Sequence, residues 1–291
     1  MGKIALGVHD VGHPVYSLEL APRVEKLGFT RYWISEHHEA ASGQITNPTL
    51  LGALVAGVTE EMMVGPGGVL LRYAAPLKVA EDFRLLAQLF PGRIELGLGK
   101  GLAPDEATAA ALLDGRSPQY GDADHWKRFE QIRALLSGDD PSVTVALTRA
   151  ASDPLPLVWV LGTSVASAVD AARLGAPYAY SDFFAPEGGA RAIATYVETF
   201  VPSPTLSQPK WLVSLGGFCS EDEQVLAAFS QTPGPRRRAT NGTPEAWRQT
   251  LIEARKAYQT DEILIMNRWG ISDFEQTVTS YELIAQVAAT L

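Results

Sequence analysis

The sequence predicts an α/β fold, a (β/α)8 TIM barrel, from two observations. Short runs of strand character alternate with longer amphipathic segments, a pattern typical of parallel strands joined by crossover helices. About eight such strands fall within 291 residues, a length that suits one barrel better than two domains. We therefore expect a single domain over residues 1–291, and a doubly wound open sheet is the alternative fold.

Each expected strand is an apolar or β-branched run bounded by glycine, proline or polar residues. In chain order the strands are Ile4–Val8, Thr30–Ser35, Met63–Leu70, Ile94–Leu98, Leu157–Leu161, Tyr178–Ser181, Trp211–Gly217 and Glu262–Met266. The segments between and after them have amphipathic spacing and are expected to be helical. These helices are residues 17–28, 48–59, 77–89, 123–136, 164–174, 187–200, 221–230, 244–258 and 272–290.

The spacing is uneven between the fourth and fifth strands. About 58 residues separate them, whereas a typical barrel needs one helix and two short loops there. We expect an insertion that includes the helix Trp126–Leu136 and the β-branched stretch Val143–Val145, which could be an added strand or hairpin over the barrel's mouth. A surface elaboration without function is an equally weighted alternative.

Composition excludes several function classes. The formal charge of −9, from 33 acidic and 24 basic residues, opposes broad attraction to nucleic acid or to an anionic membrane. The single cysteine, Cys219, excludes an internal disulfide and a thiolate metal cluster, and it is expected to be a small buried side chain. The apolar run at the N-terminus is too short for a signal peptide, and no run of about 20 apolar residues occurs. We expect a cytoplasmic protein that neither crosses nor binds a membrane.

A histidine pair follows the second expected strand. His37 and His38 are two of only five histidines, and they stand where an apolar run ends. Imidazole titrates near neutrality, and barrel enzymes carry their chemistry at the carboxyl ends of strands. Both residues are therefore candidate general acids or bases. A metal-dependent hydrolase is an alternative, but adjacent strand residues point to opposite faces and no second His/Asp cluster has matching spacing.

Two glycine-containing loops are candidate anion sites. Gly97–Gly101 follows the fourth strand and combines close backbone approach at Gly99 with the charge of Lys100. Its spacing lacks the third glycine and the helix of a dinucleotide fingerprint, and a solvated lysine in a tight turn is the simpler interpretation. After the fifth strand, Gly162–Ser167 opens a helix with hydroxyl groups. These residues can cap the helix or hold a phosphate at its positive end.

Seven motifs, in this order and spacing, together resemble one family over nearly the whole chain. They are Glu36-His37-His38 with Asn47-Pro48, Val64–Val69, Ala75–Glu81, Pro91–Gly99, Leu161–Ser164, Gly242–Glu245 and Ser280–Leu283. The sequence is similar to the bacterial luciferase-like flavin-dependent monooxygenases, also called luciferase-like class flavin-dependent oxidoreductases. The resemblance implies a β/α barrel that binds reduced FMN.

The resemblance also implies residue roles. His37 matches the family's catalytic acid/base near the flavin, and His38 is a less certain partner. Gly67-Gly68 matches the dipeptide that often forms a non-prolyl cis peptide under the isoalloxazine ring. Lys100, beside Gly99, stands where relatives carry an arginine on the FMN phosphate. The other implied phosphate-binding residues are Gly162, Thr163, Ser164 and Ser167.

The implied reaction is oxygenation of a small organic substrate. In the family, reduced FMN reacts with O2 to form a flavin hydroperoxide, and the protein positions the reactants and excludes water. Reduced flavin is expected from a separate NAD(P)H:flavin reductase. A homodimer is also expected, with its apolar seam on the helices after the second and third strands.

Two other interpretations within the same fold stay open. A deazaflavin-dependent oxidoreductase would have the same barrel and phosphate loops. A flavin-binding protein without turnover is favoured by the compact segment before Gly242. The sixth strand is followed by Ser181-Asp182-Phe183-Phe184, where relatives often have a histidine, and this exchange predicts a more apolar pocket.

Overall fold

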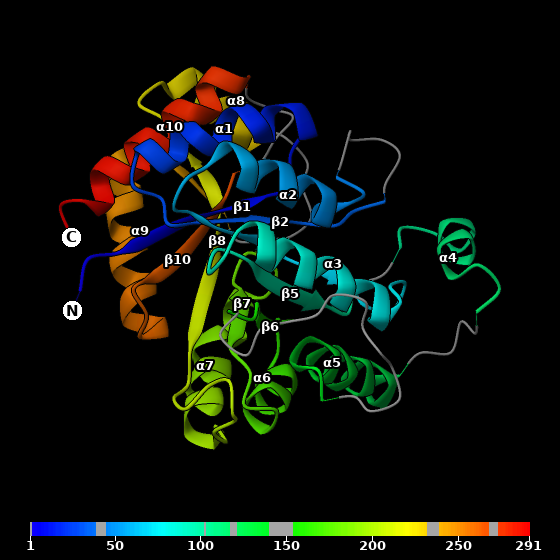
Figure 1. Cartoon of the computed structure of the whole chain (residues 1–291). Coiled ribbons are helices and arrows are strands. Elements are labelled where there is room, and N and C mark those ends of the chain that lie inside the picture. The colour runs from blue at the N-terminus through cyan, green and yellow to red at the C-terminus, as the bar shows by residue number, and fades with distance from the viewer. Residues whose placement is uncertain are drawn as a thin grey trace.

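Parallel strands surrounded by helices form the body of the molecule (Figure 1). The computed structural model describes residues 2–38, 45–101, 103–116, 121–139, 154–231, 239–267 and 273–291, without the side chains of residues 230 and 231. The strands are β1 (Ala5–Asp10), β2 (Arg31–Ile34), β3 (Met63–Pro66), β4 (Val69–Leu70), β5 (Glu95–Gly99), β6 (Leu157–Gly162), β7 (Tyr178–Ser181), β8 (Trp211–Cys219), β9 (Thr240–Gly242) and β10 (Glu262–Met266). Their order in the sheet is β3-β2-β1-β10-β8-β7-β6-β5-β4, and β9 pairs with β8 outside that path.

The two ends of this strand order meet, so the sheet closes on itself. β3 and β4 are consecutive parts of the single strand predicted over Met63–Leu70, interrupted at the cis peptide bond Gly67-Gly68. On the β5 side, Val64 N donates to Arg93 O over 2.8 Å, and Val64 and Ile94 form a parallel bridge. With β3 and β4 counted together, the described strands fill the eight positions of a (β/α)8 barrel, which confirms the predicted fold.

The helices form a layer around the barrel (Figure 1). They are α1 (Pro14–Lys26), α2 (Pro48–Val58), α3 (Pro76–Leu89), α4 (Glu106–Leu113), α5 (Asp122–Ser137), α6 (Val165–Arg173), α7 (Gly189–Thr199), α8 (Glu223–Gln231), α9 (Pro244–Tyr258) and α10 (Phe274–Ala288), with a 3-10 turn at Pro186–Gly188. A search of these helices finds none with the length and hydropathy needed to span a membrane.

The sequence prediction differs from this arrangement in three places. One predicted strand is divided into β3 and β4, and the short strand β9 was not predicted. Between β5 and β6 lie α5, which was predicted, and α4, which was not; Figure 1 shows α4 standing away from the barrel. The predicted β-branched stretch Val143–Val145 lies outside the described residues.

Local sequence signals explain where several helices begin. The side chain of Asn47 accepts from Leu50 N over 2.9 Å, and Pro48 occupies the first turn of α2. Thr243 caps α9 in the same way, followed by Pro244. Each cap satisfies a backbone N–H that the helix itself cannot pair, and proline needs no such partner. These helices therefore start directly after the strands or loops that precede them.

Apolar side chains form two separate clusters on the two faces of the closed sheet. Val158 and Val160 of β6 belong to the large cluster between strands and helices, whereas Trp159 between them belongs to a small one. Because successive strand residues point to opposite faces, the small cluster fills the barrel interior. Its buried members are Trp33, Trp159, Ala179, Leu212 and Leu264.

A buried ion pair occupies the amino-terminal end of the barrel interior. Arg31 begins β2 and Glu95 begins β5, and Arg31 Nε donates to Glu95 Oε2 over 2.7 Å. The indole N–H groups of Trp33 and Trp159 donate to the same carboxylate over 2.8 and 3.1 Å. Glu95 is 1% exposed, so these donors compensate the loss of its hydration. This end of the barrel is closed, which leaves the carboxyl ends of the strands for a binding site.

Cys219, at the end of β8, is fully buried. Burial raises the pKa of its thiol to about 12, so the thiol stays protonated at neutral pH. It acts as a small apolar side chain, as the sequence predicted.

Candidate functional site

A cavity of about 740 Å³ lies at the carboxyl ends of the barrel strands. Its wall includes residues from or directly after β1, β2, β4, β5, β6, β7 and β10, together with the link between β3 and β4. Its volume falls in the range of about 300–1,000 Å³ that is usual for small-molecule sites. Nine of the ten predicted site residues line it: His37, Gly67, Gly68, Gly99, Lys100, Gly162, Thr163, Ser164 and Ser167. The tenth, His38, does not.

Glycines form one side of the cavity because the backbone there is too crowded for a side chain. A Cβ at Gly68 would lie 2.6 Å from Gly97 O and 3.2 Å from a methyl carbon of Leu161. A Cβ at Gly67 would lie 3.0 Å from the ring of Trp33. Both glycines line the cavity, so only their backbone faces a ligand there.

His37 and His38 have different surroundings. His37 lines the cavity, and its backbone N donates to Ile45 O over 2.9 Å. The Nε2 atom of His38 lies 2.9 Å from Glu36 Oε1, and the other oxygen of Glu36 accepts from Leu70 N over 2.8 Å. Glu36 thus joins the end of β2 to β4 and also contacts His38. His38 does not line the cavity, and its predicted catalytic role stays a prediction.

The sequence analysis missed a second histidine in the cavity wall, His9. It lies in β1, is 4% exposed and lines the cavity. Its Nδ1 is 2.8 Å from Ser214 Oγ, and its Nε2 is 2.9 Å from both Ser35 Oγ and Gly67 O. A carbonyl only accepts hydrogen bonds, so the Nε2 atom carries the proton and donates it to Gly67 O.

Burial keeps His9 neutral. Loss of hydration is the main effect that lowers its pKa to about 4; the bond to Gly67 O opposes the shift, and nearby His37 adds to it. At neutral pH, His9 is therefore a fixed hydrogen-bonding group that joins β1, β8 and the glycine link. The signal in the sequence was a histidine at a strand's carboxyl end, but the predicted strand stopped at Val8.

The start of α6 presents hydrogen-bond donors to the cavity. Ser164 Oγ accepts from Ser167 N over 3.2 Å, and Ser164 N donates to Ser167 Oγ over 3.3 Å, which makes a reciprocal cap. Ser167 Oγ also donates to Ser164 O over 2.8 Å, so its hydroxyl is already used inside the turn. A Cβ at Gly162 would lie 2.1 Å from Ser167 Oγ, so a glycine is required there. Thr163 and Ser164 are exposed, and of the four residues they are the best placed to meet a ligand.

Lys100, across the same end of the cavity, is held by α5. Its Nζ donates to Asp122 Oδ1 over 2.8 Å and lies 4.3 Å from the centre of the Trp126 ring. Asp122 also lines the cavity. The hydrogen bond from Lys100 is the main effect that lowers the pKa of Asp122, so its carboxyl group is ionised at neutral pH.

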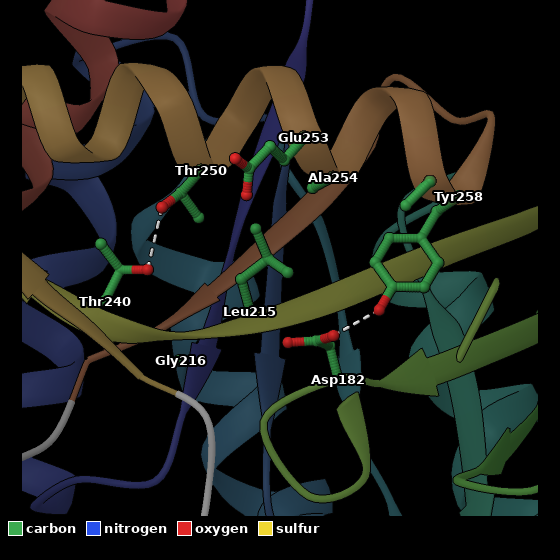
Figure 2. Close-up of a pocket in the computed structure, with 9 residues that line it drawn as sticks. Asp182, Leu215, Gly216, Thr240, Thr250, Glu253, Ala254 and Tyr258 are labelled. Carbon is green, nitrogen blue, oxygen red and sulfur yellow. Dashed lines mark hydrogen bonds between the residues drawn. The ribbon is translucent and has the colours of Figure 1, made fainter. Parts of the chain in front are cut away.

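The segment after β7 divides between two cavities. Phe183 and Phe184 line the large cavity, as the predicted apolar character of this segment requires. Asp182 points the other way, toward the hydroxyl of Tyr258, into a second cavity of about 170 Å³ between β8 and α9 (Figure 2). In that cavity Thr240 and Thr250 are hydrogen-bonded over 2.9 Å (Figure 2). No predicted site residue lines the second cavity.

Within the described ranges no group of three or more His, Cys, Asp or Glu residues is arranged to hold a metal ion. The apolar part of the wall, neutral His9, the ammonium group of Lys100 and the amino-terminal end of α6 suit an aromatic ligand that carries an anionic group.

Comparisons with known proteins identify a family and similar structures. The family model described as luciferase-like monooxygenase matches residues 3–258. A luciferase-like monooxygenase of Escherichia coli (strain K12) is 37% identical over 233 residues, covering 78% of this chain and 68% of that protein. The crystal structure of apo-MsnO8 has a TM-score of 0.87 at 33% identity and covers 98% of both chains.

More distant structures share the fold and differ in cofactor. The oxygenating constituent of 3,6-diketocamphane monooxygenase from Pseudomonas putida, in complex with FMN, has a TM-score of 0.76 at 17% identity, covering 99% of this chain and 98% of that one. An F420-dependent secondary alcohol dehydrogenase, with an F420-acetone adduct, has a TM-score of 0.74 at 14% identity and covers 99% of both chains. Because the family model matches most of this chain and apo-MsnO8 is similar to it over nearly the whole length, the chain belongs to the luciferase-like monooxygenase family.

Proposed function

We propose that the protein is a monooxygenase that uses reduced FMN and O2 to oxygenate a small organic substrate. The observation that carries this proposal is the large cavity itself, which joins a glycine side, two histidines and an anion-binding end at the carboxyl ends of the barrel strands. Family membership supports the reaction class. The FMN complex of a protein with the same fold supports the choice of cofactor.

The residues present fit a flavin. Gly67 and Gly68 line the cavity with backbone alone, against which a flat ring could lie. Lys100 and the exposed first residues of α6 are the proposed ligands of the phosphate. When bound, the reduced flavin would supply the electrons that activate O2.

His37 is the proposed proton donor and acceptor at the reacting substrate. It lines the cavity where β2 ends, whereas burial lowers the pKa of His9 in the same wall to about 4 and makes that ring a poor proton acceptor at neutral pH. His9 would hold the glycine side in place and stay neutral through the cycle. Phe183, Phe184 and Met266 contribute apolar surface to the cavity, which favours a substrate of apolar character and the exclusion of water.

We propose that a separate NAD(P)H:flavin reductase supplies reduced FMN, because the sequence has no dinucleotide fingerprint. The single buried cysteine favours the cytoplasm as the location.

We also propose a homodimer that buries α2 and α3. Both helices carry large apolar side chains on their outer faces at a spacing of four residues, and a contiguous exposed apolar stripe is typical of a protein contact surface. These residues are Leu50, Leu54 and Val58 on α2, and Leu85 and Leu89 on α3, each at least 45% exposed. Analytical ultracentrifugation should give a dimer that Leu54→Glu dissociates; a wild-type monomer would contradict this assembly.

The function is tested by supplying the protein with FMN, NADH and a flavin reductase and screening small organic compounds for O2-dependent addition of one oxygen atom by mass spectrometry. His37→Asn should lower turnover of a product-forming substrate by at least about 100-fold and leave FMN binding unchanged. His13→Asn is the matched control, because His13 caps α1 and does not line the cavity. Normal turnover by His37→Asn would refute the role of His37. Binding of F420 in preference to FMN would favour a deazaflavin-dependent oxidoreductase.

A further inference from the structure

The cation at the proposed phosphate site is already paired with a carboxylate. Among the described residues that line the cavity, Lys100 is the only lysine or arginine. Its ammonium group donates to Asp122 Oδ1 over 2.8 Å and lies over the Trp126 ring at 4.3 Å. Both partners come from the first two turns of α5, 22 or more residues along the chain. Helix α5 therefore positions the ammonium group of Lys100 and, through Asp122, also neutralises its charge.

Among the described residues that line the cavity, no second cation offsets the charge of Asp122. His125, one turn from Asp122, is buried, and burial together with the charge of Lys100 lowers its pKa to about 4. It is thus neutral at pH 7. The other carboxylate lining the cavity, Glu36, is occupied by His38 and Leu70 N. Lys100 and Asp122 together contribute no net charge to this end of the cavity.

We propose that Asp122 competes with the phosphate of a flavin for Lys100, and so sets how tightly phosphorylated flavins bind; the inference rests on the proposed function. A phosphate monoester carries nearly two negative charges at pH 7. To bind Lys100 it either displaces Asp122 or shares the ammonium group with it beside a like charge. Either way, part of the favourable interaction energy between the phosphate and Lys100 is lost. A flavin bound in this way exchanges with the solution more readily than one bound to an unpaired lysine.

The exposure of the pair limits the size of the effect. The side chains of Lys100 and Asp122 are 34% and 77% exposed, so water and salt screen their interaction. Exposed ion pairs of this kind change an equilibrium by about two- to fivefold at low ionic strength. We expect Asp122→Asn to tighten FMN binding by about that factor and to leave the binding of riboflavin, which lacks the phosphate, unchanged.

The experiment is a titration of the purified protein with FMN and with riboflavin, followed by flavin fluorescence at low and high salt. Four variants are compared with the wild type: Asp122→Asn, Lys100→Met, the double variant, and Glu130→Gln. Glu130→Gln removes the same charge from the exposed face of α5, away from the cavity. Circular dichroism checks that α5 and the fold persist in each variant.

Competition predicts that Asp122→Asn tightens only FMN, that high salt reduces the gain, that Glu130→Gln has no effect, and that the gain disappears when Lys100 is already Met. Unchanged or weaker FMN binding by Asp122→Asn would overturn the inference and leave the proposed function intact. Equal tightening of riboflavin, or a gain that persists in the Lys100→Met background, would also overturn it. A wild-type protein that binds neither flavin would contradict the proposed function together with the inference.

Discussion

Placing a methyl group on Gly68 should damage both the fold and the flavin site. A Cβ there would lie 2.6 Å from Gly97 O, 2.9 Å from Gly97 C and 3.2 Å from a Leu161 methyl carbon. Two of these atoms belong to the backbone of β5, which pairs with β6 and β4, so they cannot move without disturbing the barrel. Such overpacking typically costs about 1–3 kcal/mol. We expect Gly68→Ala to lie at the upper end of that range, because backbone atoms are the obstacle.

Gly99→Ala is the matched control for this prediction. Gly99 lines the same cavity, but a Cβ there would meet only Val69 O, at 3.9 Å, an ordinary contact. Urea unfolding followed by tryptophan fluorescence gives the free energy of unfolding, and FMN titration gives the affinity. Gly68→Ala should lose about 2–3 kcal/mol of stability and weaken FMN binding, and Gly99→Ala should change stability by less than about 0.5 kcal/mol. Equal effects of the two substitutions, or a fully stable Gly68→Ala that binds FMN normally, would refute the argument from close approach.

Two further predictions concern buried titratable side chains, His9 and Glu95. The pKa of His9 is 6.5 in the unfolded chain and about 4 in the folded protein, so the folded state binds fewer protons between these pH values. The contribution of His9 to the free energy of unfolding is therefore fully present above pH 6.5 and is lost as the pH falls toward 4. Between pH 7 and 5 the wild type should lose roughly 2 kcal/mol more than His9→Asn in urea unfolding, and parallel pH profiles would contradict this assignment. Glu95→Gln should lower the free energy of unfolding by about 3–5 kcal/mol, because it leaves Arg31 buried with only the half-buried Glu262 as a carboxylate partner. Glu262→Gln should cost less than about 1 kcal/mol, and similar losses for both would show that burial does not control the effect.

The parts of the fold with local signals could be predicted from the sequence. Strand runs bounded by glycine or proline and helices with amphipathic spacing located the barrel. The break between β3 and β4 was not predicted, because Val64–Leu70 is one nearly continuous apolar and glycine run. The break coincides with the cis peptide bond Gly67-Gly68, and an added Cβ at these positions would meet Trp33 or Gly97, which come from distant parts of the chain.

In the candidate site too, residues in local motifs could be predicted, and residues brought together only by the fold could not. Motifs beside strand ends located His37, Lys100 and Ser164, and the family resemblance implied Gly67; all four line the cavity. His9 was missed because the predicted strand ended at Val8, two residues before the end of β1. Its partners Ser35, Gly67 and Ser214 lie up to 205 residues away, so no local pattern marks them. Asp122 was missed for the same reason, since only the packing of α5 brings it to Lys100.

The central claim is that the cavity binds a reduced flavin through its phosphate at Lys100 and through its ring at the glycine side. An anaerobic titration with reduced FMN, read by quenching of tryptophan fluorescence, tests it most directly. The account predicts saturable binding of one reduced FMN per chain, weakened roughly tenfold by Lys100→Met, with riboflavin bound equally by both proteins. No saturable binding, or an affinity for FMN that Lys100→Met leaves unchanged, would contradict it.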